Sequence, residues 1–110
     1  MTYETITVDI ADQIATLTLN RPERLNAMSL DMADEINTAI SGNLGDARVL
    51  LITGAGRAFC SGADLQARGG GSAASGGEAS YAALTRHYNP MMMKLARLDM
   101  PVITAVNGPA

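Results

Sequence analysis

The chain has 110 residues, of which 47% are apolar, and its 11 acidic and 8 basic residues give a formal net charge of −3 at pH 7. This length suits one domain with a real core, and the mild acidity excludes the basic footprint of nucleic-acid-binding proteins. The single cysteine excludes an internal disulfide and fits a reducing compartment. The first residues show no basic segment followed by an apolar run, so we expect no signal peptide, and no run in this sequence approaches roughly 20 apolar residues. We therefore expect a cytoplasmic protein that binds neither nucleic acid nor membrane.

Two alternating runs open the chain. Residues 5–10 and residues 14–19 each place every second apolar side chain on one face, and a short turn-like gap separates them. This pattern predicts an antiparallel hairpin. Pro22 ends the second strand, because proline lacks a backbone donor, and a loop follows as far as Met28.

Helical spacing follows from Leu30 to Ile40, with Ser29 as the expected N-cap and Gly42 as the expected end. Acidic side chains in the first turns complement the helix dipole and are interpreted as capping and solubility features rather than catalytic groups. These are Asp31, Asp34 and Glu35.

The most informative stretch begins with the apolar run at residues 49–53, which predicts a buried strand. Gly54 and Gly56 then indicate a turn, and residues 63–65 are expected to form a first helical turn. The sequence order is strand, turn, short extended piece and helix start. Together with the hairpin and the first helix, this order predicts a mixed α/β fold.

A helix start presents backbone N–H groups that have no internal acceptor, which suits an anion or a developing oxyanion. Gly62 and Ala63 would keep the approach to such a point open. An ordinary glycine-rich connection between a strand and a helix explains the same residues, and the pattern alone leaves both interpretations open. Asp64 is expected to cap the helix and orient the loop rather than transfer protons.

Residues 66–80 are rich in glycine, serine and alanine and predict a flexible loop, either a mobile loop beside a site or a linker. A helical pattern returns from Ser80, and Pro90 should kink or restart that helix. Met91 to Met93 are interpreted as core packing, with the wall of an apolar pocket as the alternative. Residues 102–106 predict a further buried strand before a turn.

Nucleophiles and ligands are sparse. Cys60 and Ser61 have no evident base and are interpreted as small turn residues. His87, the only histidine, has no partner nearby in the sequence and is expected on a helix surface. No metal-ligand cluster, phosphate-binding loop or dinucleotide motif is present, so we expect no metal and no cofactor.

Three segments, in order, resemble the enoyl-CoA hydratase/isomerase (crotonase) superfamily. The oxyanion-hole segment of that family is similar to AFCSGADL at residues 58–65. Its first CoA-contacting loop is similar to NRPERLNAM at residues 20–28, and the strand and turn before its second oxyanion donor are similar to MPVITAVNGPA at residues 100–110. The resemblance spans the chain from Ile6 to Ala110.

This resemblance implies a spiral of ββα units, of which residues 1–110 would be the N-terminal part of one core domain, with residues 66–80 as a variable loop beside the active site. The backbone N–H of Ala63 would be the catalytic oxyanion donor. The residues implied in substrate binding are Arg24, Ala27, Gly62, Ala63, Asp64, Leu65 and Gly108.

The activity implied first is hydration of a 2-enoyl-CoA, with coenzyme A as part of the substrate. The alternatives are a Δ3,Δ2-enoyl-CoA isomerase, a non-catalytic CoA-binding relative, and a structural α/β fragment. The second donor and the catalytic acids of the family match positions beyond Ala110. The 110-residue chain alone is therefore expected to be inactive and poorly folded, and the intact subunit to form a homotrimer or hexamer.

Overall fold

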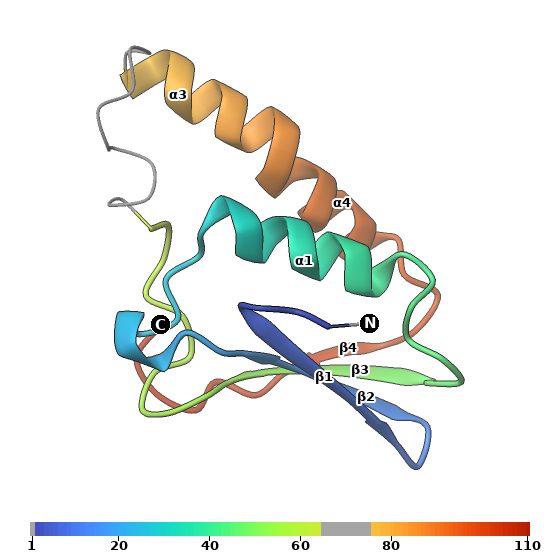
Figure 1. The fold of residues 1–110 in the computed structure, drawn as a ribbon. Coiled ribbons are helices and arrows are strands. Elements are labelled where there is room, and N and C mark those ends of the chain that lie inside the picture. The colour runs from blue at the N-terminus through green and yellow to red at the C-terminus, as the bar shows by residue number, and fades with distance from the viewer. Residues whose placement is uncertain (1, 65–75) are drawn as a thin grey trace.

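A computed structural model describes residues 2–64 and 76–110. Its centre is a four-stranded sheet in the order β1-β2-β3-β4 (Figure 1). β1 and β2 are antiparallel, whereas β3 runs parallel to β2 and β4 runs parallel to β3. The strands are β1 (Ile6–Ala11), β2 (Ile14–Leu19), β3 (Val49–Gly54) and β4 (Val102–Thr104). The predicted hairpin and the mixed α/β class are confirmed.

The β1–β2 turn is made by Asp12 and Gln13, which both have positive φ angles, 53° and 65°. Two successive residues with positive φ form the kind of tight turn whose twist matches a β-hairpin. The register pairs Leu17 with Ile52 of β3 and Ala15 with Leu50. Alternation along β2 therefore directs its buried side chains to one face of the sheet, where the core lies.

Helix α1 (Leu30–Ile40) covers that face (Figure 1). Ser29 caps it as predicted, because its Oγ accepts a hydrogen bond from the Met32 N–H at 3.1 Å. Gly42 follows the last turn with a φ of 84°, which confirms the predicted end of the helix. Five side chains of α1 are buried in the core: Met32, Ala33, Ile36, Ala39 and Ile40.

A long helical arm returns over the same side of the sheet as α3 (Gly76–Ala83), the π-helical turn η2 (Leu84–Tyr88) and α4 (Asn89–Ala96). The Asn89 N–H donates to the carbonyl of Leu84, five residues back. Pro90, which has no N–H, follows immediately in the first turn of α4. The predicted restart of the helix at proline is therefore confirmed, and it takes the form of a π turn.

Only the second half of the arm packs against the core. Met91 of α4 is 5% exposed and joins the core cluster, whereas Tyr81 of α3 is 71% exposed. Figure 1 shows why, because α3 extends beyond the end of α1 and away from the sheet. The apolar side chains of the arm are thus divided between α3, where Tyr81 is exposed, and α4, where Met91 is packed against the core.

Helix α3 begins at Gly76, so the predicted loop at 66–80 is wrong for its last five residues. Glu78 lies in the first turn, where a negative charge favours a helix start and offsets the low helix propensity of Gly76 and Gly77. Residues 66–75 of that predicted loop lie outside the described residues.

Strand β4 corrects a second expectation. It comprises only Val102–Thr104, and Val102 and Ile103 are 38% and 53% exposed, although a buried strand was predicted. β4 is the edge of the sheet, and the described residues place no element over its outer side. Apolar composition predicted the strand, but its place at the edge decided its exposure. Within the two described ranges, no helix has the length and apolar character needed to cross a bilayer.

Candidate active site

Ala63 lies in an extended segment that pairs with Met28 in an isolated parallel bridge. Met28 uses both of its backbone groups in that bridge: its N–H donates to the Gly62 carbonyl at 2.7 Å, and its carbonyl accepts from the Asp64 N–H at 2.9 Å. Both bonds therefore go to the neighbours of Ala63, and its own N–H faces away from Met28.

Within the described part of the chain, the N–H of Ala63 donates to no acceptor, and the residue is exposed. This is the arrangement that an oxyanion donor requires, because a donor engaged in a ladder could not reach a ligand. The predicted helical turn is wrong for Ala63 and Asp64, which are extended and non-helical, and Leu65 lies outside the described residues.

Gly62 owes its identity to its backbone conformation. Its φ is 107°, a region that side chains rarely adopt, and a Cβ built there would meet no atom within 4 Å. Glycine is therefore needed for the turn that leads into Ala63 rather than for space. An open approach in front of residue 63 follows from the same geometry.

Gly108 is a close-approach glycine. A Cβ at this position would collide with the carbonyl of Arg57, and the neighbouring Pro109 carbonyl accepts from the Phe59 N–H at 2.9 Å. Gly108 therefore joins the C-terminal loop to the turn after β3. Its predicted contact with substrate stays a prediction, and the structure gives it a packing role.

Asn26 is the site residue that sequence reasoning missed. It is fully buried, its Oδ1 accepts from the Arg21 N–H at 2.7 Å, and its Nδ2 donates to the carbonyls of Ala55 and Ala58 at 2.9 Å each. Its φ of 55° is left-handed, which asparagine tolerates better than most residues. An asparagine within a tight loop was therefore the feature of the sequence that could have indicated this role. Asn26 thus fixes the loop at residues 20–28 against the turn after β3.

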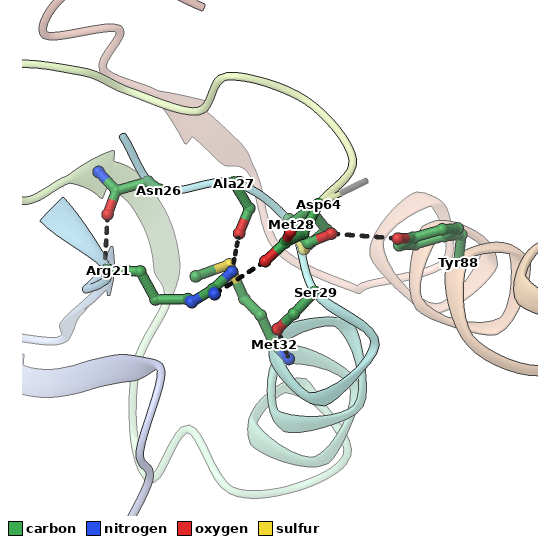
Figure 2. Close-up of polar contacts among 8 residues, drawn as sticks. All are labelled: Arg21, Asn26, Ala27, Met28, Ser29, Met32, Asp64 and Tyr88. Atoms are coloured by element: carbon green, nitrogen blue, oxygen red, sulfur yellow. Dashed lines mark hydrogen bonds and ion pairs between the residues drawn. The ribbon is translucent and has the colours of Figure 1, made fainter. Parts of the chain in front are cut away.

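Arg21 links that loop to the segment of Ala63. Its Nη1 donates to the Ala27 carbonyl at 2.6 Å, and its Nη2 contacts the Asp64 carboxylate at 2.8 Å (Figure 2). Asp64 is 5% exposed. The structure gives Asp64 an ion pair with a residue 43 positions earlier, and the helix that Asp64 was predicted to cap lies outside the described residues.

The other predicted CoA contacts lie on the same loop. Arg24 is exposed at the end of the 3₁₀ turn η1 (Pro22–Arg24), where its side chain can reach solvent. Ala27 is half-buried, and one lone pair of its carbonyl is engaged by Arg21. Tyr88 of η2 donates from its hydroxyl to the Met28 carbonyl at 3.1 Å, which ties the helical arm to the same loop (Figure 2).

An apolar cavity of about 250 Å³ lies between the sheet and α4. Its walls include Leu19 and Ile52 from the sheet, Met91 and Met92 from α4, and the half-buried Cys60, which is three residues before Ala63. Met91 is core, as predicted, while Met92 is 56% exposed and lines the cavity. Met91 lines the cavity as well, so core packing is confirmed for Met91 and the pocket-wall interpretation stays a prediction.

His87 pairs with an acid from another element. Its Nδ1 lies 2.7 Å from Oδ1 of Asp34, which joins η2 to α1. The predicted position on a helix surface is confirmed, and the partner, 53 positions earlier, was invisible in the sequence. Among the described residues, no group of three or more His, Cys, Asp or Glu could hold a metal ion.

The described residues thus form a mixed α/β fold, in which helices cover one face of the sheet and the backbone of Ala63 is exposed. Residues 9–110 match the family described as Enoyl-CoA hydratase/isomerase. The chain belongs to this family.

Named relatives agree. The chain is 39% identical over 110 residues to a probable enoyl-CoA hydratase of Rhodobacter capsulatus, a match that covers 100% of this chain and 41% of the relative. It is 42% identical over 99 residues to 1,2-epoxyphenylacetyl-CoA isomerase of Escherichia coli, covering 88% of this chain and 37% of that protein. The chain thus spans about two-fifths of the length of these relatives.

Solved structures show the same fold. The structure of an enoyl-CoA hydratase/isomerase from Xanthobacter autotrophicus Py2 superposes with a TM-score of 0.86 at 34% identity, over 98% of this chain and 40% of that one. An enoyl-CoA hydratase from Bacillus anthracis gives a TM-score of 0.82 at 33% identity, over 96% and 40% of the two chains. The described sheet and helices are therefore those of the N-terminal part of this fold.

Proposed function

We propose that this chain forms the N-terminal part of an acyl-CoA enzyme, and that the enzyme hydrates 2-enoyl-CoA thioesters. The observation that carries the proposal is the Ala63 N–H, which is exposed and donates to no acceptor within the described part of the chain. In this proposal the thioester oxygen of the substrate accepts that hydrogen bond.

The chemistry needs such a donor. As the oxygen of water bonds to the β-carbon, water gives up one proton to a catalytic base, the electron pair of the double bond moves toward the α-carbon, and negative charge develops on the thioester oxygen. The α-carbon then takes up a proton. A preorganised N–H aimed at the oxygen stabilises this enolate-like state more than the ground state, and one such donor is typically worth ~3–4 kcal/mol.

Substrate would lie across two parts of the chain. The loop of Arg24 and Ala27 would hold the CoA portion, with the exposed guanidinium of Arg24 facing phosphate. Gly62, Asp64 and Leu65 would border the thioester. The apolar cavity, walled by Met92 among others, is suited to the acyl portion because its lining offers no charged group.

The proposal includes four further points that rest on the family resemblance and the sequence. Coenzyme A enters as part of the substrate, and no separate cofactor is used. A second oxyanion donor and the catalytic carboxylates lie outside residues 1–110. The subunit assembles as a homotrimer or hexamer. The single cysteine fits a cytoplasmic location.

Isomerisation of an enoyl-CoA is the second candidate, because the matching family is described as Enoyl-CoA hydratase/isomerase. Moving a double bond passes through the same oxyanion state, so Ala63 would serve both reactions. The acids that deliver protons distinguish them: a carboxylate that activates water indicates a hydratase, and one that moves a proton between carbons indicates an isomerase. A relative that keeps the Ala63 donor but lacks these acids would only bind CoA.

The test deletes one N–H. In the complete protein that carries this chain, Ala63→Pro removes the donor without breaking either hydrogen bond of the bridge to Met28. We expect kcat/KM for a short 2-enoyl-CoA to fall about 100- to 1,000-fold. Ala63→Gly is the matched control, because it keeps the N–H and should stay within about three-fold of the parent.

Two results would contradict the proposal. A folded Ala63→Pro protein with undiminished turnover would show that this amide is not the donor. A parent protein that neither binds to immobilised CoA nor converts an enoyl-CoA would reject acyl-CoA chemistry altogether. Retention on the CoA resin that is lost in Ala63→Trp, where a large side chain fills the approach, would support the binding site independently.

A further inference from the structure

Within the described residues, three backbone hydrogen bonds hold the segment of Ala63 to the loop before α1. Two belong to the bridge of one residue with Met28, and the third runs from the Ser61 N–H to the Leu25 carbonyl at 3.1 Å. A regular strand would hold a backbone amide through a series of bonds on either side. Here the neighbouring side chains must supply the remaining restraint.

The adjacent Asp64 supplies it through Arg21. The Asp64 carboxylate is 5% exposed and lies 2.8 Å from Nη2 of Arg21, whose side chain is 17% exposed. The same guanidinium donates from Nη1 to the Ala27 carbonyl at 2.6 Å. Ala27 immediately precedes Met28 in the chain. One planar group therefore holds both sides of the bridge that carries Ala63 (Figure 2).

We propose that Arg21 is the positioning residue for the Ala63 amide, and that it acts by clamping Asp64 to the Ala27 carbonyl. This inference rests on the proposed function, because it gives Arg21 its role in orienting an oxyanion donor. Arg21 touches no reacting atom. By holding Asp64, it fixes the direction of the N–H of Ala63, the residue directly before Asp64.

Arginine suits this task better than lysine. Two parallel N–H donors in a rigid fork reach a carboxylate and a carbonyl at the same time, whereas an ammonium group on a flexible stem cannot hold both in fixed directions. Burial adds to the effect, because a carboxylate that is removed from water is held tightly by its charged partner. Pro22, directly after Arg21, limits the backbone freedom of the clamp.

The experiment uses the complete protein that carries this chain and compares four variants with the parent. Arg21→Met keeps the length of the side chain and removes the fork. Arg21→Lys keeps the charge. The double variant Arg21→Met with Asp64→Asn also removes the buried charge that loses its cationic partner in Arg21→Met. Arg48→Met is the control, since Arg48 is exposed at the start of β3, in a different part of the chain.

Four quantities are measured: kcat and KM for a short 2-enoyl-CoA, the midpoint of thermal unfolding, and the infrared stretching frequency of a ¹³C-labelled thioester carbonyl in the bound state. We expect Arg21→Met to lower kcat about 10- to 100-fold, because a small misplacement of a catalytic group has effects of that size. KM should change by less than about three-fold, since the lost interaction belongs to the transition state. The carbonyl band should shift back toward its frequency in free substrate.

The double variant separates positioning from stability. Removing the buried charge should recover much of the lost unfolding temperature, because a buried carboxylate without its cationic partner destabilises the fold. The kcat and the carbonyl band should nevertheless stay as in Arg21→Met. Recovery of kcat together with stability would overturn the inference, because Arg21 would then act on the fold alone. Arg48→Met should match the parent.

If Arg21→Met does not fold, Arg21→Lys provides the test instead. We expect Arg21→Lys to lower kcat about three- to ten-fold and to move the carbonyl band part of the way, because the ammonium holds only one of the two acceptors. Parental values of both quantities would overturn the inference. A parent protein without binding or turnover would reject the proposed function itself, and that result needs no variant.

Discussion

At the scale of single residues, side-chain amides hold the backbone around Ala63. Asn26 and Asn107 both donate to the carbonyl of Ala58, at 2.9 and 3.2 Å, so this one oxygen receives a donor from each side. The Oδ1 of Asn107 also accepts from the Gly54 N–H at 3.0 Å. The turn after β3 is short of backbone partners, and these two asparagines replace them.

Asn26→Asp tests this replacement. The substitution keeps the shape but places an oxygen opposite the carbonyls of Ala55 and Ala58, so both lose the Asn26 donor and Ala58 keeps only that of Asn107. We expect the free energy of unfolding of the complete protein to fall by about 2–4 kcal/mol in urea titrations at pH 7. Asn43→Asp, on an exposed loop, is the control and should cost less than about 1 kcal/mol. Equal effects of both changes would contradict this account.

At the scale of elements, α1 organises the N-terminal half, because it is capped at its start, buried along one side and bonded to the strand before it. The Glu35 carboxylate accepts hydrogen bonds from the Glu4 N–H, from the Thr5 N–H at 2.8 Å and from the Thr5 hydroxyl at 2.7 Å. These bonds tie the entrance of β1 to the helix. They give an acidic residue of the first turns a structural task.

The N-cap of α1 gives one prediction at this scale. Ser29→Ala removes the acceptor of the Met32 N–H, and we expect a loss of about 1 kcal/mol in the free energy of unfolding. Ser41→Ala, at the exposed end of the same helix, removes a bond to the Asn37 carbonyl and should cost less than about 0.5 kcal/mol. The ratio of the two losses, measured by urea titration, checks the assignment of the cap.

Glu35 gives a prediction on pH. Desolvation would raise the pKa of Glu35, but the hydrogen bonds from Thr5 and Glu4 outweigh it and lower the pKa below its ordinary 4.5. A lowered pKa in the folded state means that the ionised form stabilises the fold. That stabilisation is fully present above pH 4.5 and is lost as the pH falls through the folded pKa.

Glu35→Gln should therefore be less stable than the parent at pH 7, and the difference should shrink below pH 4.5. Thermal unfolding of both proteins between pH 3 and pH 7 measures this difference in stability. Glu23→Gln, on the exposed η1 turn, serves as the control for a general loss of negative charge. A difference that grows on acidification would contradict the argument.

At the scale of the whole molecule, the sheet is covered on one face and open on the other. Ile14 and Ile103 lie on the face away from α1 and are 42% and 53% exposed. Tyr81 and Met92 on the helical arm are also exposed. This amount of exposed apolar surface is more than a stable small domain usually leaves in water.

We therefore expect the 110-residue chain, made alone, to be poorly folded and inactive. It should bind the dye ANS strongly, show a broad thermal transition, and give no measurable hydration or isomerisation of a short enoyl-CoA. A sharp, cooperative transition without dye binding would show that the open face is tolerated. Turnover comparable to that of an intact family enzyme would contradict the expected need for further catalytic groups.

Local pattern predicted most of the elements. Alternation fixed the hairpin and its turn, helical spacing with Ser29 and Gly42 fixed α1, and Pro90 marked the restart of the helical arm. These succeeded because their causes lie within a few residues: the pleat of a strand, the cap of a helix, and the missing N–H of proline. The family followed from motifs whose order along the chain is itself sequence information.

Contacts between distant residues were decided only in three dimensions. Asp64 meets Arg21 across 43 positions and His87 meets Asp34 across 53, so no local pattern could pair them. The exposure of β4 depended on its place at the edge of the sheet rather than on its apolar composition. The sequence around Ala63 indicated a possible donor site. Only the register of the bridge with Met28 decided that its amide points away from the protein backbone, because in a parallel pairing the residue opposite is left out of the hydrogen bonds.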